Sequence, residues 1–146
     1  DDLGLAAAID WYAKTALAKA DIEAVVKAEG LDDRLPLKVE IALYRIAQEA
    51  VANVIKHSYA RRCTLTLTSA KGAVELVIAD DGRGFDPEKI GRAGEEHLGI
   101  VGMQERVRSL DGQFAIHSRP REGTRVHIRI PLPAAGASGE DSSAAG

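Results

Sequence analysis

The chain has 146 residues, 45% of them hydrophobic and 28% charged, and a formal net charge of -3. These totals describe one globular domain, and they give no electrostatic reason to expect a nucleic acid or an anionic membrane as a partner. Cys63 is the only cysteine, which excludes an internal disulfide and fits a reducing compartment such as the cytoplasm. No signal peptide and no membrane-spanning apolar run is recognisable. Because the chain opens at Asp1 without a methionine, we expect a piece of a longer protein.

The first half of the chain predicts two helices separated by a short strand. Apolar residues recur at helical spacing over 5–18, where Trp11 is expected in the core or as a packing anchor for whatever precedes the chain. The β-branched run 22–28 predicts a strand, and Pro36 suits the start of a helix over 37–57. The predicted core stripe of this second helix consists of Leu37, Ile41, Tyr44, Ala47, Val51 and Ile55.

The second half predicts two pairs of strands with a helix between them. The predicted strand pairs are 63–68 with 74–79, joined at AKGA, and 113–118 with 124–130, joined at RPREG. The helix is predicted over 99–110. Residues 134–146 are Ala, Gly and Ser with two acids, so we expect a disordered tail. Helices and strands do not alternate strictly, which predicts an α+β sandwich with helices on one face of the sheet.

A column of polar residues lies on the second predicted helix. Glu49, Asn53 and Lys56 stand at i, i+4 and i+7, so an ideal helix places a carboxylate, an amide oxygen and a cation on one face. This combination suits a ligand that carries phosphate and a hard metal ion. A solvated face of an ordinary amphipathic helix explains the same pattern, and the helix alone does not decide between the two interpretations.

The sequence DDGRGF follows an apolar strand directly. Gly82 and Gly84 permit positive φ and close approach of the backbone to a ligand. Asp80, at the end of the strand, can accept a hydrogen bond from an exocyclic amine such as that of adenine. A simple turn is the alternative interpretation, whereas the further oxygen ligands of an EF-hand are missing.

Two further glycine-bearing segments come later in the chain. LGIVGM opens the predicted helix at 99, where free N–H groups and the glycines Gly99 and Gly102 would receive a phosphate. Its spacing excludes the Rossmann and P-loop motifs. Arg106 could reach toward such a pocket. Thr124 follows Gly123 and could bond a phosphate or a water, or simply end a hairpin turn. Neither a zinc ligand set nor a Ser-His-Asp arrangement is indicated.

The four blocks QEAVANVIKH, DDGRGF, HLGIVGMQERV and REGTRVHIRIPL, in this order, resemble the N, G1, G2 and G3 boxes of the GHKL ATPases. More closely, the chain resembles the catalytic ATP-binding domain of sensor histidine kinases of the nitrate/nitrite-sensor type. The resemblance extends from DDLGLAAAI to IPLP. It implies a Bergerat-type two-layer sandwich over 1–133, with a mixed, mostly antiparallel sheet and a short ATP lid.

The resemblance also implies roles for the residues of the helical column and the later glycines. Asn53 would hold Mg²⁺, Lys56 would contact phosphate, and His57 would lie near the ribose or the phosphates. Gly99 and Gly102 would hinge the lid and meet the phosphates.

Other residues acquire implied roles at the base and at the reacting end. Asp80 would bind the adenine amine, directly and through water, Gly82 and Gly84 would shape the adenine pocket, and Thr124 would assist beside it. Glu49 stands where related ATPases keep a base that activates water. In a kinase Glu49 would instead orient a metal-bound water or polarise the acceptor.

The histidine that receives phosphate in such kinases has no counterpart in this sequence. The expected function is therefore to bind Mg-ATP and to donate the γ-phosphoryl group to a histidine on a dimerisation/phosphoacceptor domain outside the chain. A cognate response regulator is the expected partner of the full-length kinase. Two alternatives stay open, an ATP-hydrolysing clamp and a non-catalytic nucleotide-binding module. Asp111 and Arg121 stand where relatives often have Gly, which leaves those loop conformations in question.

Overall fold

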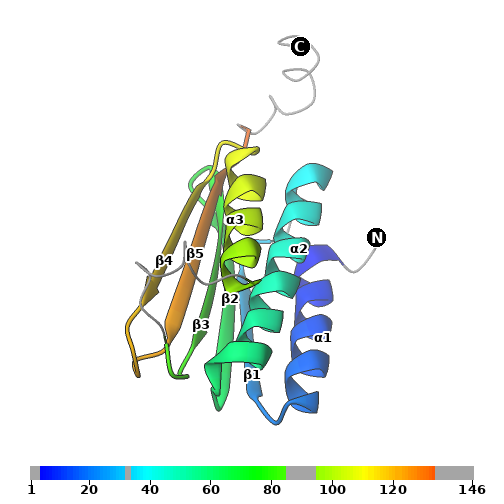
Figure 1. Ribbon diagram of the computed structural model, residues 1–146. Helices are drawn as coiled ribbons and strands as arrows, with labels where there is room; N and C mark the ends of the chain where they lie inside the picture. Colours follow the sequence, from blue (N-terminus) through cyan, green and yellow to red (C-terminus); the bar gives the residue numbers. More distant parts are fainter. Residues whose placement is uncertain (1–3, 32–33, 85–94, 134–146) are drawn as a thin grey trace.

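The computed structural model describes residues 4–31, 34–84 and 95–133, and these residues form two layers (Figure 1). One layer is a five-stranded sheet, and the other consists of helices that cover one face of it. In chain order the elements are α1 (Gly4–Lys19), β1 (Glu23–Glu29), α2 (Leu37–Asn53), the π-helix η1 (Val54–Ser58), β2 (Arg62–Ala70), β3 (Ala73–Asp80), α3 (Glu95–Arg108), β4 (Gln113–Ser118) and β5 (Thr124–Pro131). The predicted tail and the predicted lid between the glycine segments lie largely outside the described residues.

The sheet is mixed and mostly antiparallel, as predicted. Its strand order is β1-β2-β3-β5-β4, and only the β1–β2 pair is parallel, because α2 crosses over between these two strands. The β2–β3 hairpin turns at Lys71 and Gly72, whose φ angles of 55° and 78° match a type I′ turn. The predicted second hairpin, β4–β5, is also present. The α+β sandwich is therefore confirmed.

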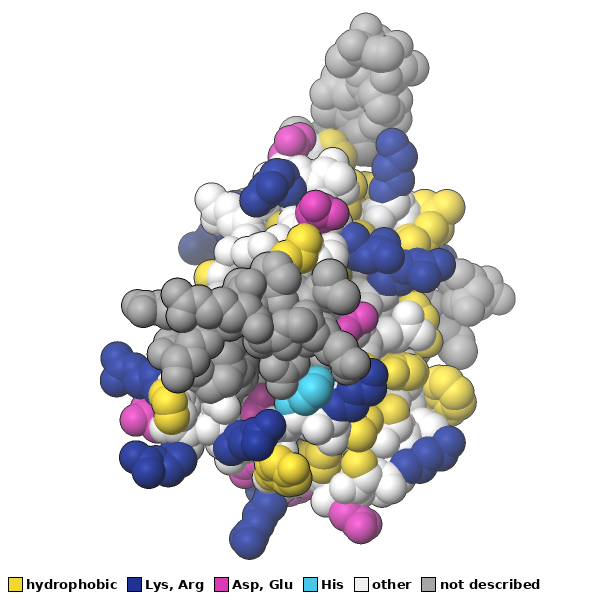
Figure 2. Space-filling model, in the orientation of Figure 1, with side chains coloured by type: hydrophobic (Ala, Val, Ile, Leu, Met, Phe, Trp, Pro, Cys, Tyr) yellow, Lys and Arg dark blue, Asp and Glu magenta, His cyan; other side chains and the backbone are white. Residues whose placement is uncertain are grey.

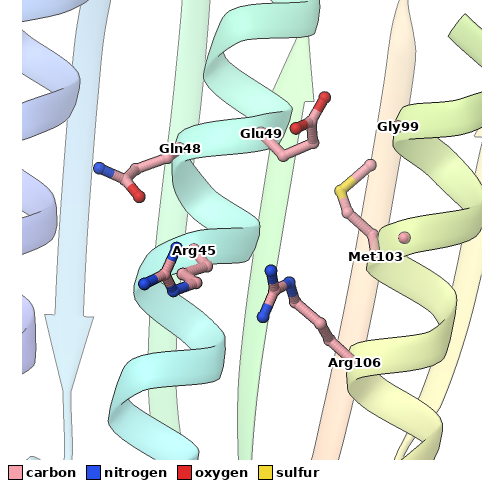
Figure 3. Close-up of a pocket in the computed structure, with 7 residues that line it drawn as sticks. Arg45, Gln48, Glu49, Gly99, Met103 and Arg106 are labelled. Carbon is pink, nitrogen blue, oxygen red and sulfur yellow. The ribbon is translucent and has the colours of Figure 1, made fainter. Parts of the chain in front are cut away.

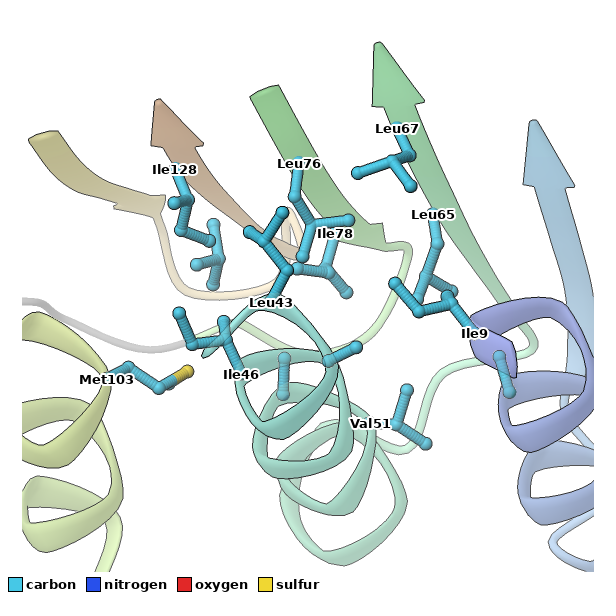
Figure 4. Close-up of a cluster of buried hydrophobic side chains, with 14 of the residues drawn as sticks. Ile9, Leu43, Ile46, Val51, Leu65, Leu67, Leu76, Ile78, Met103 and Ile128 are labelled. Atoms are coloured by element: carbon cyan, nitrogen blue, oxygen red, sulfur yellow. The ribbon is translucent and has the colours of Figure 1, made fainter. Parts of the chain in front are cut away.

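The core lies between the sheet and the helices (Figure 4). Alternate residues of the central strands point to the helical layer, so Leu65, Leu76 and Ile128 are at most 1% exposed. Leu43 and Ile46 of α2 meet them from the opposite side and are fully buried. Because α2 packs on the middle of the sheet, its orientation fixes which of its residues reach the functional site.

The predicted core stripe of α2 is wrong at three positions. Leu37, Ile41 and Ile55 are 67%, 48% and 37% exposed, whereas Ala47 and Val51 are buried as expected. The buried face of α2 consists of Val39, Glu40, Ala42, Leu43, Ile46, Ala47, Ala50 and Val51. The helix carries apolar residues on almost every side, so spacing alone could not select the face that packs on the sheet.

Trp11 also differs from expectation. Trp11 is 66% exposed, so it is not a core residue, and its role as an anchor for a preceding segment stays a prediction. Asp111 and Arg121, whose loop conformations the sequence left in question, adopt left-handed φ angles of 59° and 69° without being glycine. No helix in the described ranges is long and apolar enough to cross a membrane.

Cys63 is expected to be inert in the folded protein. Its side chain is fully buried in β2, and burial, reinforced by the charges of Asp80 and Asp81, raises the pKa of the thiol to about 12. Because only the thiolate reacts quickly, a disulfide-exchange reagent should label native protein very slowly at pH 8. One equivalent should react after denaturation in guanidinium chloride. Rapid labelling of the native protein would contradict the buried position.

Candidate functional site

The C-terminal end of α2 changes its pitch next to the predicted column. After Asn53 the chain continues as the π-helix Val54–Ser58 and ends at Tyr59, which has a left-handed φ of 54°. Ser58 Oγ donates to the Val54 carbonyl at 2.7 Å and accepts from the Ala60 N–H at 3.0 Å. Lys56 lies in this wider turn, so the i+7 spacing of an ideal α-helix does not place it above Glu49.

Glu49 and Asn53 lie against α3 at Gly99. A Cβ at Gly99 would be 2.6 Å from Glu49 Oε2 and 3.6 Å from Asn53 Nδ2. The absence of a side chain therefore allows α3 to approach both polar groups of α2. The helix itself starts at Glu95, four residues earlier than predicted. The Gly99 amide is consequently inside the helix and is not among its first four N–H groups, contrary to expectation.

Asp80 lies at the end of β3, directly opposite Thr124 of β5. Its half-buried carboxylate accepts the Gly82 N–H at 2.8 Å and a backbone hydrogen bond from Thr124. Burial raises the pKa of Asp80, and these two hydrogen bonds oppose the shift. The Thr124 hydroxyl lies 2.8 Å from Ser118 Oγ. In the described residues no cation forms an ion pair with Asp80.

Close backbone packing holds the loop after β3 in place. A Cβ at Gly82 would overlap the carbonyl oxygen of Ser58, so only glycine fits there, and the Arg83 N–H donates to the same carbonyl at 2.7 Å. Asp81 fixes the other side of the loop, because its Oδ1 accepts the N–H groups of Arg61 and Arg62 at 2.8 and 3.0 Å. Sequence reasoning missed these structural roles of Ser58 and Asp81, which no motif spacing indicates.

Gly84 likewise leaves no room for a side chain. Its φ is 64°, and a Cβ would overlap the Arg119 carbonyl oxygen of the β4–β5 turn. Gly84 has the positive φ that the sequence predicts, whereas Gly82 does not, and both glycines allow close packing against the protein's own backbone. The approach of a ligand to Gly82 and Gly84 stays a prediction.

A cavity of about 280 Å³ opens between α2 and α3 (Figure 3). Met103, which lies at its wall, is 2% exposed and belongs to the core. The cavity is lined by Arg45, Gln48 and Glu49 of α2 and by Gly99, Gly102, Met103 and Arg106 of α3. Sequence reasoning did not single out Arg45, because an arginine on an amphipathic helix is usually an ordinary solvated residue.

The predicted site residues therefore fall into two groups. Glu49, Asn53, Gly99 and Gly102 gather where α2 meets α3, and Asp80, Gly82, Gly84 and Thr124 gather at the ends of β3 and β5. Lys56 and His57 lie in the π-helix, whose last residue packs on Gly82. In the described residues no group of three or more His, Cys, Asp and Glu side chains could hold a metal ion by itself. A metal here would need the amide of Asn53 together with oxygens from a ligand.

The sequence model of the family described as histidine kinase-, DNA gyrase B- and HSP90-like ATPases matches residues 38–134, which contain both groups. The chain belongs to this family. It is 39% identical over 132 residues to the signal transduction histidine-protein kinase/phosphatase DegS of Brevibacillus brevis, covering 90% of this chain and 33% of that protein. It is 37% identical over 134 residues to the sensor histidine kinase MctS of Rhizobium johnstonii, covering 92% and 29%.

A solved structure agrees with the fold of this ATPase domain. The histidine kinase domain from the blue-light activated histidine kinase of Erythrobacter litoralis EL346 superposes with a TM-score of 0.68 at 23% identity. The match covers 88% of this chain and 61% of that chain. At this identity the likeness establishes the two-layer fold. The chain spans about a third of the length of the curated relatives it matches.

Replacing Asp80 by Asn should stabilise the ligand-free protein at neutral pH. Because its pKa is raised by folding, the folded state binds the proton more tightly than the unfolded state. The free energy of unfolding of the wild-type protein therefore falls as the pH rises through the raised pKa of Asp80. Asn keeps an oxygen acceptor for the Gly82 N–H without the buried charge. Urea unfolding from below pH 3.8 to pH 7 should show an advantage of Asp80→Asn that grows with pH.

The neighbouring substitution Asp81→Asn is the matched control and should have the opposite sign. Hydrogen bonds from the Arg62 and Arg61 N–H groups lower the pKa of Asp81, so its charge stabilises the fold above the ordinary pKa. A loss of stability in Asp80→Asn at pH 7 would show that the hydrogen bonds outweigh the cost of burial.

Proposed function

We propose that this chain is the ATP-binding catalytic domain of a sensor histidine kinase. It binds Mg-ATP and donates the γ-phosphoryl group to a histidine on a dimerisation/phosphoacceptor domain outside the chain. The observation that carries this proposal is the half-buried carboxylate of Asp80, which two backbone N–H groups orient at the end of β3. Since it has no cation partner in the described residues, its remaining lone pairs are available to an amine donor such as that of adenine.

The other group of residues is assigned to the metal and the phosphates. Asn53 would hold Mg²⁺ through its side-chain oxygen, Lys56 would contact phosphate, and His57 would lie near the ribose or the phosphates. Glu49, which borders both Asn53 and the cavity, would orient a metal-bound water or polarise the acceptor. The packing of Gly99 against Glu49 and Asn53 supports this assignment, because it brings the α3 segment onto the same polar groups. When bound, Mg²⁺ would offset part of the negative charge of the phosphates.

The partners follow from the same proposal. The parent protein supplies the acceptor histidine, and a cognate response regulator receives the phosphoryl group from it in the cytoplasm. The relatives' names support a two-component role over the 90% of this chain that aligns with DegS. Membership of the nitrate/nitrite-sensor subgroup rests on the resemblance of the motifs alone, since DegS and MctS carry other names.

Titration with adenine nucleotides tests the assignment of the two groups. Asn53→Ala should weaken binding only when Mg²⁺ is present, and Asp80→Asn should weaken binding with or without the metal. Loss of one charged hydrogen bond corresponds to an affinity roughly 10- to 100-fold lower. Isothermal calorimetry with ADP, with and without Mg²⁺, measures both effects. The controls are Gln113→Ala and Asp10→Asn, which change the same chemical groups at other places. Wild-type affinity in both site variants would refute the assignment.

Phosphoryl transfer separates the kinase from the alternative functions. A longer form of the parent chain that includes the acceptor domain should form phosphohistidine from ATP, stable to base and labile to acid. Steady release of phosphate without phosphohistidine would instead favour an ATP-hydrolysing clamp, in which Glu49 activates water. Nucleotide binding with neither reaction would leave a non-catalytic module.

A further inference from the structure

Two arginines from different helices line the cavity between α2 and α3. Arg45 stands one turn before Glu49 on α2, and Arg106 stands two turns after Gly99 on α3. Figure 3 shows Arg106 extending from α3 toward α2. The rest of the wall is small or neutral, apart from Glu49, whose carboxylate oxygen lies against Gly99. The cavity thus contains more positive than negative charge.

Neither guanidinium is neutralised by the part of the chain that the structure describes. Arg34, Arg62 and Arg129 each pair with a glutamate at 2.7, 3.0 and 3.8 Å, but no described acid forms an ion pair with Arg45 or Arg106. Lys and Arg are also the commonest charged side chains on the face shown in Figure 2, although the chain is acidic overall. Two like charges in one cavity repel each other, and a bound anion offsets that repulsion.

The size and the position of the cavity indicate which anion it receives. At about 280 Å³ it is slightly smaller than the roughly 300–1,000 Å³ of pockets for whole small molecules, so it suits one anionic group better than a purine. Asn53, the proposed metal ligand, lies two turns beyond Arg45 on α2, a rise of about 12 Å. Arg106 reaches into this space from α3 (Figure 3), so a triphosphate that starts at the Asn53 metal site and passes Glu49 would approach its guanidinium group.

We propose that Arg45 and Arg106 bind the terminal phosphoryl group of the nucleotide in this cavity, so that the domain distinguishes ATP from ADP. Guanidinium groups suit this role, because their planar N–H donors bind phosphate oxygens in pairs. The inference rests on the proposed function, since it needs a nucleotide bound beside Asp80 and Asn53. It adds a discrimination between nucleotides that the two groups of predicted site residues do not provide.

Calorimetry with two nucleotides tests the proposal. The ligands are Mg-ADP and the magnesium complex of the β,γ-imido analogue of ATP, and the variants are Arg106→Gln and Arg45→Gln. Each substitution should lower the affinity for the triphosphate analogue about tenfold or more and should leave ADP within about twofold of wild type. Arg108→Gln on α3 and Lys38→Gln on α2 are the controls, because they remove the same charge away from the cavity and should change neither affinity.

The outcomes separate this inference from the proposed function. Wild-type protein that binds neither nucleotide would refute the function itself. Wild-type protein that binds both, with a triphosphate-to-ADP preference that neither arginine variant changes, would refute the phosphoryl site alone. Equal weakening of both nucleotides would also refute it. Thermal unfolding of each variant checks the fold, and the two arginines lie on separate helices, so either variant tests the proposal independently.

Discussion

The packing of α2 on the middle of the sheet is the constraint on which both the fold and the site depend. Leu43 and Ile46 are fully buried against the central strands, so the helix has no freedom to rotate about its axis. Glu49 and Asn53 lie at the margin of this buried face and consequently turn toward α3. Core packing therefore sets the direction of the polar groups that meet the nucleotide in the proposed function.

The carboxylate of Asp80 shows how stability is exchanged for binding at the other end of the site. Its charge is held partly out of water, and two backbone N–H groups compensate for only part of the desolvation. The chain keeps this unfavourable group in place by tight backbone packing between Ser58, Gly82 and the β4–β5 turn. A buried acceptor that is oriented but incompletely satisfied is the arrangement expected of a ligand-binding group.

Much of the fold could be predicted from the sequence, because the local sequence patterns agree with the tertiary structure. The Lys71–Gly72 turn and the alternating strands specify their hairpins without reference to the rest of the chain. The buried face of α2 could not be predicted, since Leu37 and Ile41 are as apolar as Leu43 and Ile46. Which of them are buried depends on how the helix packs on the sheet. The cavity could not be predicted either, because the packing of two helices from distant parts of the sequence brings Arg45 and Arg106 to it.

The π-helix after Asn53 changes the directions in which the following side chains point. In a regular helix the buried stripe dictates the direction of every later side chain, 100° per residue. The wider turn over 54–58 shifts this phase, so Lys56 and His57 point in directions that an uninterrupted α-helix would not give them. A substitution that removed the Ser58 contacts and restored a regular α-helical turn would therefore redirect both side chains without changing the packing of α2 on the sheet.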